Sequence, residues 1–155
     1  MILKDIVKAL VVLTPDYFDE PVDEVIMLAS SSPAKTLVYL KYFEDADPAK
    51  YRYLDKMDYD KKKEQAHALY EKQSKRIRDA GLDVDILQPH FGIAAEEILR
   101  VERELGLDII IIAVPKRSIY RRILNGVHFS EEVSRKAITP ILLVEQSTSQ
   151  RIFVN

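Results

Sequence analysis

The stretch "DIIIIAVPKRSIYRRILNGVHFSEE", residues 108–132, is the part of the sequence that decides the fold. Residues 109–114 are aliphatic and show no polar alternation, which is typical of a strand covered on both faces of a sheet. The segment then turns basic, and Ser130 is placed to cap a helix whose first turn is acidic. A loop between such a strand and helix often grips a phosphate, but this loop has one glycine, Gly126. The stretch therefore predicts an α/β scaffold and leaves its ligand in question.

Strand and helix patterns alternate over the rest of the chain as well. The predicted strands are residues 6–13, 35–43, 84–87, 109–114 and 141–144. The predicted helices bury one face each, formed by Val22, Val25, Ile26 and Ala29, by Ala66, Leu69, Gln73 and Ile77, by Ile98, Val101 and Leu105, and by Val133 and Ala137. Such alternation implies right-handed crossovers between parallel strands. We predict one doubly wound, Rossmann-like α/β domain over residues 1–145, a five-stranded parallel sheet with helices on both faces.

Two segments lie outside this α/β frame. Residues 44–60 are charged and rich in tyrosine, so we predict a long, variable loop or lid after the second strand. Its Tyr51, Tyr53 and Tyr59 either pack the loop down or stack on a base. Residues 146–155 form a polar linker followed by a short apolar end, which either docks as an extra edge strand or frays.

The composition of the chain excludes several classes of function. The formal net charge of -2 over 155 residues provides no basic field for nucleic acid or an acidic membrane surface. Cysteine is absent, which excludes disulfides, thiolate metal sites and a cysteine nucleophile. No apolar stretch reaches the roughly 20 residues of a membrane helix, and the N-terminal segment lacks a signal-peptide cleavage pattern. We therefore expect a cytoplasmic protein.

Residues 91–145, "FGIAAEEILRVERELGLDIIIIAVPKRSIYRRILNGVHFSEEVSRKAITPILLVE", resemble the C-terminal half of the universal stress protein (UspA-like) domain. The positions that fall in step with the family pattern are Gly92, Ala95, Glu96, Glu97, Ile98, Asp108, Arg117, Ser118, Arg122, Leu124, Glu131, Val133, Arg135, Ala137 and Pro140. The N-terminal half matches mainly in its order of strand, helix and strand. The resemblance implies the adenine nucleotide alpha hydrolase-like variant of the predicted fold.

Family members that bind ATP carry Gly-x-x-Gly, nine further residues, and then Gly followed by Ser or Thr. Glycines let backbone N–H groups approach the phosphates, and the hydroxyl reaches a phosphate oxygen beside a helix N-terminus. Counted forward from the strand, the glycine positions fall on Ala113, Lys116 and Gly126, and Val127 stands in place of the hydroxyl. Counted back from Pro140, the last pair becomes Val127 and His128. Either count leaves at most one glycine of three.

Two further features bear on a nucleotide site. The family places an aspartate at the end of the first strand, and here Asp16 comes one residue late, while Gly92 precedes the third helix. The loop is also basic, and its Lys116, Arg117 and Arg122 either form a side-chain phosphate site or face solvent. The candidate nucleotide-binding residues are Asp16, Gly92, Ala113, Lys116, Arg117, Arg122, Gly126, Val127 and His128.

Catalytic and metal-binding patterns are missing from the sequence. There is no G-x-S-x-G for a hydrolase, no G-x-G-x-x-G after the first strand and no P-loop pattern. His90 and His128 lie in two candidate ligand loops, but a metal site requires more ligands than these. We expect no metal, no catalytic residue and no enzymatic activity.

The resemblance implies that members without the glycine motif form a non-nucleotide-binding class that acts in stress response, commonly as homodimers. The last strand, with Ile141, Leu142, Leu143 and Val144, is the expected dimer interface, unless residues 146–155 cover this edge instead. We expect a binding or regulatory protein without a cofactor, whose protein partner the sequence does not reveal. The alternatives are a member that binds ATP through the basic loop and hydrolyses it slowly, and a small-molecule enzyme of the same wider fold group.

Overall fold

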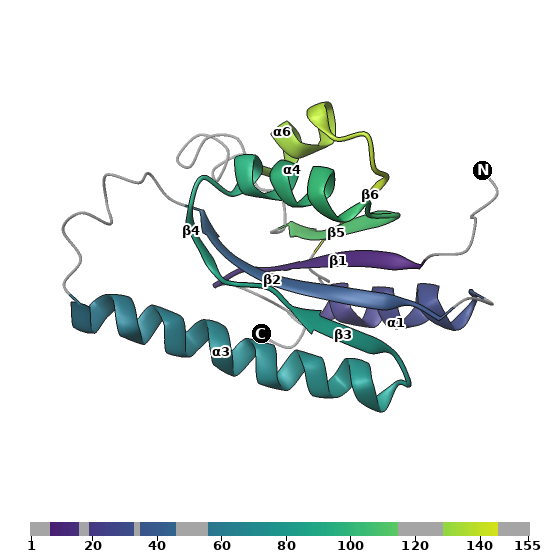
Figure 1. Cartoon of the computed structure of the whole chain (residues 1–155), viewed down its shortest axis with the longest axis horizontal. Coiled ribbons are helices and arrows are strands. Elements are labelled where there is room, and N and C mark those ends of the chain that lie inside the picture. Colours follow the sequence, from purple (N-terminus) through teal and green to yellow (C-terminus); the bar gives the residue numbers. More distant parts are fainter. Residues whose placement is uncertain (1–6, 16–18, 33–34, 46–55, 115–128, 146–155) are drawn as a thin grey trace, which may run out of the picture.

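The structure, a computed structural model, describes residues 7–15, 19–32, 35–45, 56–114 and 129–145 (Figure 1). The described elements follow in the order β1 (Lys8–Leu13), α1 (Glu20–Ser30), β2 (Leu37–Asp45), α3 (Lys56–Asp79), β3 (Asp83–Ile86), β4 (His90–Gly92), α4 (Ala94–Leu105), β5 (Ile109–Val114), α6 (Phe129–Lys136) and β6 (Ile141–Glu145).

The described strands form one open parallel sheet, as predicted. Its order is β3-β2-β1-β5-β6, and the short strand β4 continues beside β2 after β3 has ended. The chain builds outward from β1 to β2 and β3, and then crosses to the other side of β1 for β5 and β6. In the centre of the sheet, Val11 of β1 lies between Leu40 of β2 and Ile111 of β5. The fold is therefore doubly wound.

Helices cover both faces of the sheet, with α1 and α3 on one side and α4 and α6 on the other (Figure 1). Alternate residues of β1 enter the two cores: Val11 packs on the side of α1 and α3, and Val12 on the side of α4 and α6. Residues 109–112 of β5 are likewise buried whichever face they point to. Burial on both faces explains why these strands carry no polar alternation.

Most predicted helical faces are confirmed by burial. Val22, Ala66, Ile98 and Val133, one from each helix, are completely buried. Gly106 ends α4 in the left-handed conformation at φ 64°, and its N–H donates to the Glu102 carbonyl at 3.3 Å. Glycine adopts this conformation without a steric cost, so it ends the helix here.

Besides shifts of one or two residues at strand ends, three features differ from the prediction. Helix α3 begins at Lys56 and β2 extends to Asp45, so the predicted loop 44–60 is too long, and residues 46–55 lie outside the described residues. The early turns of α3 extend beyond the core and are largely exposed, so they carry no apolar stripe by which the sequence would reveal a helix. Helix α6 begins at Phe129, which places Ser130 inside its first turn rather than at its cap. The third difference is β4, a sixth strand that was not predicted because it has only three residues, His-Phe-Gly.

Of the three tyrosines in the predicted loop, the structure describes Tyr59. Tyr59 belongs to α3, and its ring packs against Phe91 with the ring centroids 5.4 Å apart. Tyr59 therefore holds α3 against β4, which is the packing role of the two considered. Tyr51 and Tyr53 lie outside the described residues.

Candidate functional site

The expected ligand position is the point at which the strand order reverses, between β1 and β5. In open parallel sheets, ligands bind beyond the carboxyl ends of the strands at this point. The loops that follow these two strands contain residues 16–18 and 115–128, which lie outside the described residues. Seven of the nine candidate nucleotide-binding residues belong to these loops: Asp16, Lys116, Arg117, Arg122, Gly126, Val127 and His128.

Ala113 is described, and it lies within β5. Its exposed fraction is 5%, and it pairs with Val144 of β6, while Val114 pairs with Glu145. Ala113, which sequence reasoning placed at the first glycine position, is thus a buried residue of the strand ladder near the carboxyl end of β5.

Gly92 is also described, but it lies on the other side of the switch point from Ala113. It ends β4 and pairs with Asp45 of β2, so β2 and β1 separate it from β5. Its φ is 153°, and a Cβ added there would lie 3.3 Å from Nε2 of His90. Glycine is favoured here because side-chain-bearing residues rarely adopt this φ, and a Cβ would also require the His90 imidazole to shift by a few tenths of an ångström.

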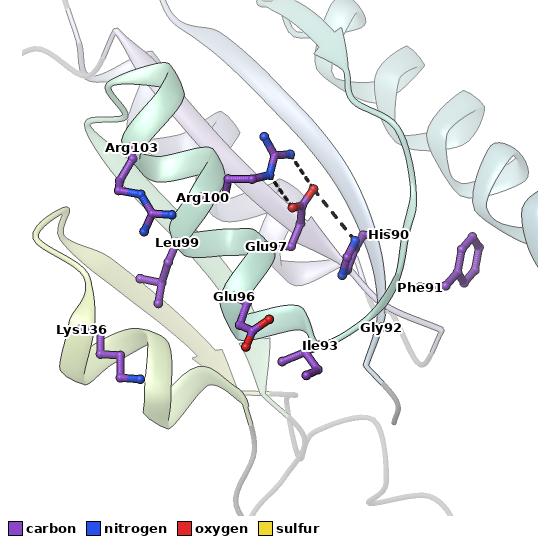
Figure 2. Close-up of a pocket in the computed structure, with 10 residues that line it drawn as sticks. All are labelled: His90, Phe91, Gly92, Ile93, Glu96, Glu97, Leu99, Arg100, Arg103 and Lys136. Carbon is purple, nitrogen blue, oxygen red and sulfur yellow. Dashed lines mark hydrogen bonds and ion pairs between the residues drawn. The ribbon is translucent and has the colours of Figure 1, made fainter. Parts of the chain in front are cut away.

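A groove of about 720 Å³ opens beside Gly92, over the N-terminal half of α4 (Figure 2). It is lined by His90, Phe91, Gly92, Ile93, Glu96, Glu97, Leu99, Arg100, Arg103 and Lys136. These residues come from β4, from the turn into α4, from α4 and from the end of α6. Sequence reasoning had assigned only Gly92 of this set to a binding site.

The inner wall of the groove is an ion-pair network centred on Glu97 (Figure 2). Arg100 donates from Nε to Oε1 at 2.6 Å and from Nη2 to Oε2 at 2.7 Å. Lys41 of β2 approaches from beneath, with Nζ 3.0 Å from Oε2. Nδ1 of His90 lies 4.0 Å from the same oxygen. Glu97 therefore joins the first turn of α4 to the sheet and to the next turn of its own helix.

The bonds from Arg100, and then those from Lys41, lower the pKa of Glu97 to about 2, against the opposing effect of its burial. A carboxylate with this pKa stays ionised at neutral pH, so it cannot donate a proton as a general acid. Its low basicity makes it an equally poor general base. The network is suited to holding structure rather than to proton transfer.

Lys41 closes a break in the sheet. Strand β3 pairs with β2 as far as Leu40, and β4 resumes the pairing at Phe43. In the gap, Lys41 donates from Nζ to the carbonyl oxygen of Gln88 at 2.7 Å. On the opposite face, the N–H of Tyr42 donates to the hydroxyl oxygen of Tyr70 at 2.7 Å. These two side chains provide hydrogen-bond partners for backbone groups in the gap.

The sequence contained a signal for this network that was not used. Lys41 interrupts the apolar run of the second strand, and a lysine inside a buried strand requires a partner. Its exposed fraction is 4%. In the described part of the chain, no group of three or more His, Cys, Asp or Glu side chains is arranged to hold a metal ion. Among the described helices, none is long and apolar enough to cross a membrane.

The sheet order and the switch point define the class of this protein as a doubly wound α/β domain. Domains of this class bind ligands at the switch point, which lies between β1 and β5 in this chain. The chain belongs to the universal stress protein family, whose sequence model, described as "Universal stress protein family", matches residues 8–145.

Solved structures show the same fold. The structure of the hypothetical protein MJ0577 is 21% identical, covers 90% of this chain and 96% of its own, and has a TM-score of 0.68. UspA from Lactobacillus plantarum is 13% identical over 90% of this chain and 98% of its own, with a TM-score of 0.64. A universal stress protein in complex with cAMP is 22% identical over 92% of this chain and 100% of its own, with a TM-score of 0.57. A search of curated protein sequences gave no match.

Proposed function

We propose that this chain is a cytoplasmic binding or regulatory protein of the stress response, without catalytic activity, that does not hold ATP in a glycine cradle. The observation that carries this proposal is the burial of Ala113 in β5, at the place of the first cradle glycine. Pro115 and Lys116 follow it in the sequence, so the cradle would also lack one N–H donor and its second glycine. A triphosphate held by backbone N–H groups needs close main-chain approach, which these residues obstruct.

Thermal melting in the presence and absence of Mg-ATP tests this proposal. A ligand at 100 times its Kd stabilises a protein by about 2.7 kcal/mol, which raises the melting temperature measurably. We expect no shift at millimolar Mg-ATP. An upward shift that grows with Mg-ATP concentration would show that the chain binds the nucleotide and would overturn the proposal.

A second candidate function is nucleotide binding through side chains of the basic loop. It is favoured by the similar universal stress protein that was solved in complex with cAMP, because a single phosphate needs fewer donors than a triphosphate. Lys116, Arg117, Arg121 and Arg122 supply positive charge in this loop. Under this alternative, a nucleotide raises the melting temperature and Arg117→Ala abolishes the shift. Slow hydrolysis would be expected only if the nucleotide is ATP.

We also propose that two copies associate through the outer edge of β6. This strand lies at the end of the sheet in the described part of the chain, and Leu143 is 42% exposed on it. Pairing of the same edge from two copies across a two-fold axis would complete the backbone hydrogen bonds. Light scattering over a concentration series tests the association. A mass that stays monomeric at the highest concentration would exclude this interface.

A further inference from the structure

Strands β3 and β4 are two parts of one edge strand, interrupted by a β-bulge. Leu40 of β2 pairs with Ile86 of β3, and Phe43 pairs with His90 of β4. Between these two pairs β2 advances by three residues and the edge strand by four, so the edge strand carries one extra residue. Pro89 lies in this interval, where its missing N–H costs no ladder bond.

The bulge reverses the face of the sheet to which each following side chain points. In β3, Val84 packs on the side of α1 and α3. Without the extra residue, strand alternation would direct His90 to that side as well. Instead Phe91 packs there, against Tyr59 of α3, and His90 turns towards α4 (Figure 2). Bulges that re-aim a side chain are common beside functional sites, so His90 is a candidate binding residue.

His90 presents one ring nitrogen to the groove beside Gly92. Nδ1 lies 4.0 Å from Oε2 of Glu97, which favours the tautomer protonated at Nδ1 and leaves Nε2 as a hydrogen-bond acceptor. Nε2 makes no hydrogen bond with the described residues. Gly92 keeps the space beside this atom open, because a Cβ there would lie 3.3 Å from it. An acceptor in this position can bind an O–H or N–H group of a ligand.

The charges of the groove favour an anion at its other end. Three cations and two anions line it: Arg100, Arg103, Lys136, Glu96 and Glu97. Glu97 is already bound by Arg100 and by the buried Lys41, so it adds no net negative charge. Glu96 lies seven residues before Arg103 on α4, about 10 Å along the helix axis, which is too far to neutralise that guanidinium.

Arg103 and Lys136 are the two cations placed to hold the anion. They lie on either side of Leu99 (Figure 2). Arg103 makes no ion pair with the described residues. Lys136 donates to Glu132 at 2.8 Å, but an exposed pair of this kind contributes little and leaves the ammonium able to bind a second anion. The guanidinium presents a planar fork of N–H donors that matches a carboxylate.

Apolar surface lies between the two polar ends of the groove. Ile93 is 40% exposed, and it is the N-cap of α4, a position at which Ser, Thr, Asp or Asn would stabilise the helix better. Leu99 is half-buried on the same helix and also lines the groove. The volume of about 720 Å³ lies in the range of small-molecule sites, roughly 300–1,000 Å³.

We propose that this groove binds a small organic acid. The carboxylate of the ligand contacts Arg103 and Lys136, its apolar body covers Ile93 and Leu99, and a hydroxyl or amino group at its far end donates to Nε2 of His90. The site is separate from the switch point, because β2 and β1 lie between β4 and β5. The proposed loss of the ATP cradle and this binding site therefore stand or fall independently.

The geometry of α4 sets the length of the ligand. His90 faces Glu97, and Arg103 lies six residues further along the helix, about 9 Å by the helical rise. The carboxylate and the donor of the ligand are therefore roughly 9 Å apart. The compound 3-(4-hydroxyphenyl)propanoate has this span and is the probe. Two analogues each lack one group: 3-phenylpropanoate has no donor, and 3-(4-hydroxyphenyl)propanamide has no charge.

NMR titration of the natural protein with the three compounds tests the proposal. We expect the probe to cause saturable shifts in the amide signals of β4, α4 and the end of α6. The compound without the hydroxyl should bind about fivefold more weakly, and the amide more than about tenfold, because a charge-assisted hydrogen bond is stronger than a neutral one. No saturable shift at about 10 mM probe, shifts in other elements only, or equal affinities for the three compounds would overturn the proposal.

Variants assign the two polar contacts. Arg103→Gln should weaken binding of the probe about tenfold. The matched control is Arg135→Gln, which removes an exposed arginine of α6 outside the groove and should change the affinity by less than about twofold. His90→Phe should abolish the preference for the probe over 3-phenylpropanoate, a result that a loss of stability alone does not produce. Equal weakening by the two arginine variants, or a preference that survives in His90→Phe, would overturn the assigned contacts.

Discussion

At the scale of single residues, Lys41 and Glu97 explain how a polar network lies within an apolar sheet. Lys41 is almost fully buried, yet its Nζ has both a carboxylate and a carbonyl oxygen within hydrogen-bonding distance. Glu97 is held in turn by the guanidinium of Arg100. A buried charge is tolerated only when it is paired in this way, so each member of the network depends on the others.

Replacing Lys41 by alanine should lower the free energy of unfolding by about 2–3 kcal/mol, since it leaves the Gln88 carbonyl without its donor and removes one of the two cations that bind Glu97. Lys35→Ala is the matched control, because the ion pair of Lys35 with Asp83 is exposed and should change stability by less than about 0.5 kcal/mol. Urea denaturation measures both variants. An equal loss of unfolding free energy in the two variants would mean that the buried ion pair stabilises the fold no more than the exposed one.

The pKa of Glu97 predicts a pH dependence of stability. Because the pKa is about 2 in the folded protein and about 4.3 in an unfolded chain, ionised Glu97 stabilises the fold above the unfolded value. This contribution is lost as the pH falls from about 4.3 towards 2. Glu97→Gln should therefore flatten the decline in unfolding free energy over this window. Urea denaturation measures the unfolding free energy of the natural protein and of Glu97→Gln as a function of pH. The same decline in both proteins would contradict the stabilising role of ionised Glu97.

At the scale of elements, two carboxylates join segments that are far apart in sequence. Oδ2 of Asp108 accepts hydrogen bonds from the N–H groups of Val7 and Lys8 at 2.9 and 2.8 Å, which ties the start of β5 to the start of β1. Oε2 of Glu102 accepts from the N–H groups of Ile138 and Thr139 at 3.1 and 2.8 Å. The second contact holds the connection between α6 and β6 against α4.

Glu102→Ala should lower the free energy of unfolding by about 2 kcal/mol, because two backbone N–H groups lose their acceptor. Glu102→Gln retains one side-chain oxygen that accepts hydrogen bonds, so we expect it to cost less than the alanine variant. Chemical denaturation of both proteins provides the comparison. An equal cost for the two variants would show that packing, rather than the hydrogen bonds, accounts for the loss.

The more fully an element is buried, the easier it was to predict from the sequence. Strand β5 was predicted with its observed bounds because six consecutive apolar residues leave no other interpretation. The start of α3 was missed because residues 57, 58 and 60 are exposed, so its first turns form no apolar stripe along the helix. Strand β4 was missed because three residues give no measurable period, and its place beside β2 depends on pairing that the local sequence does not encode.

At the scale of the whole molecule, the fold could be predicted and most of the candidate site could not. The alternation of strands and helices leaves only a few topologies, because parallel crossovers are right-handed. The groove beside Gly92 instead depends on Lys41, His90 and Glu97. Lys41 lies 49 residues before His90, and His90 lies 7 residues before Glu97, so the three meet only after β2, β4 and α4 assemble. Long-range contacts of this kind leave no spacing pattern in the sequence.

This family member retains the scaffold of the family, and we propose that it has lost the ATP cradle. The most direct measurement is the nucleotide content of the purified protein, obtained by denaturing it and separating the released small molecules by anion-exchange chromatography. We expect no adenine nucleotide in stoichiometric amount, because the sequence has Ala113 and Lys116 at two expected glycine positions and Pro115 has no backbone N–H to donate. Release of about one ATP per chain would show that the phosphates are held despite these side chains.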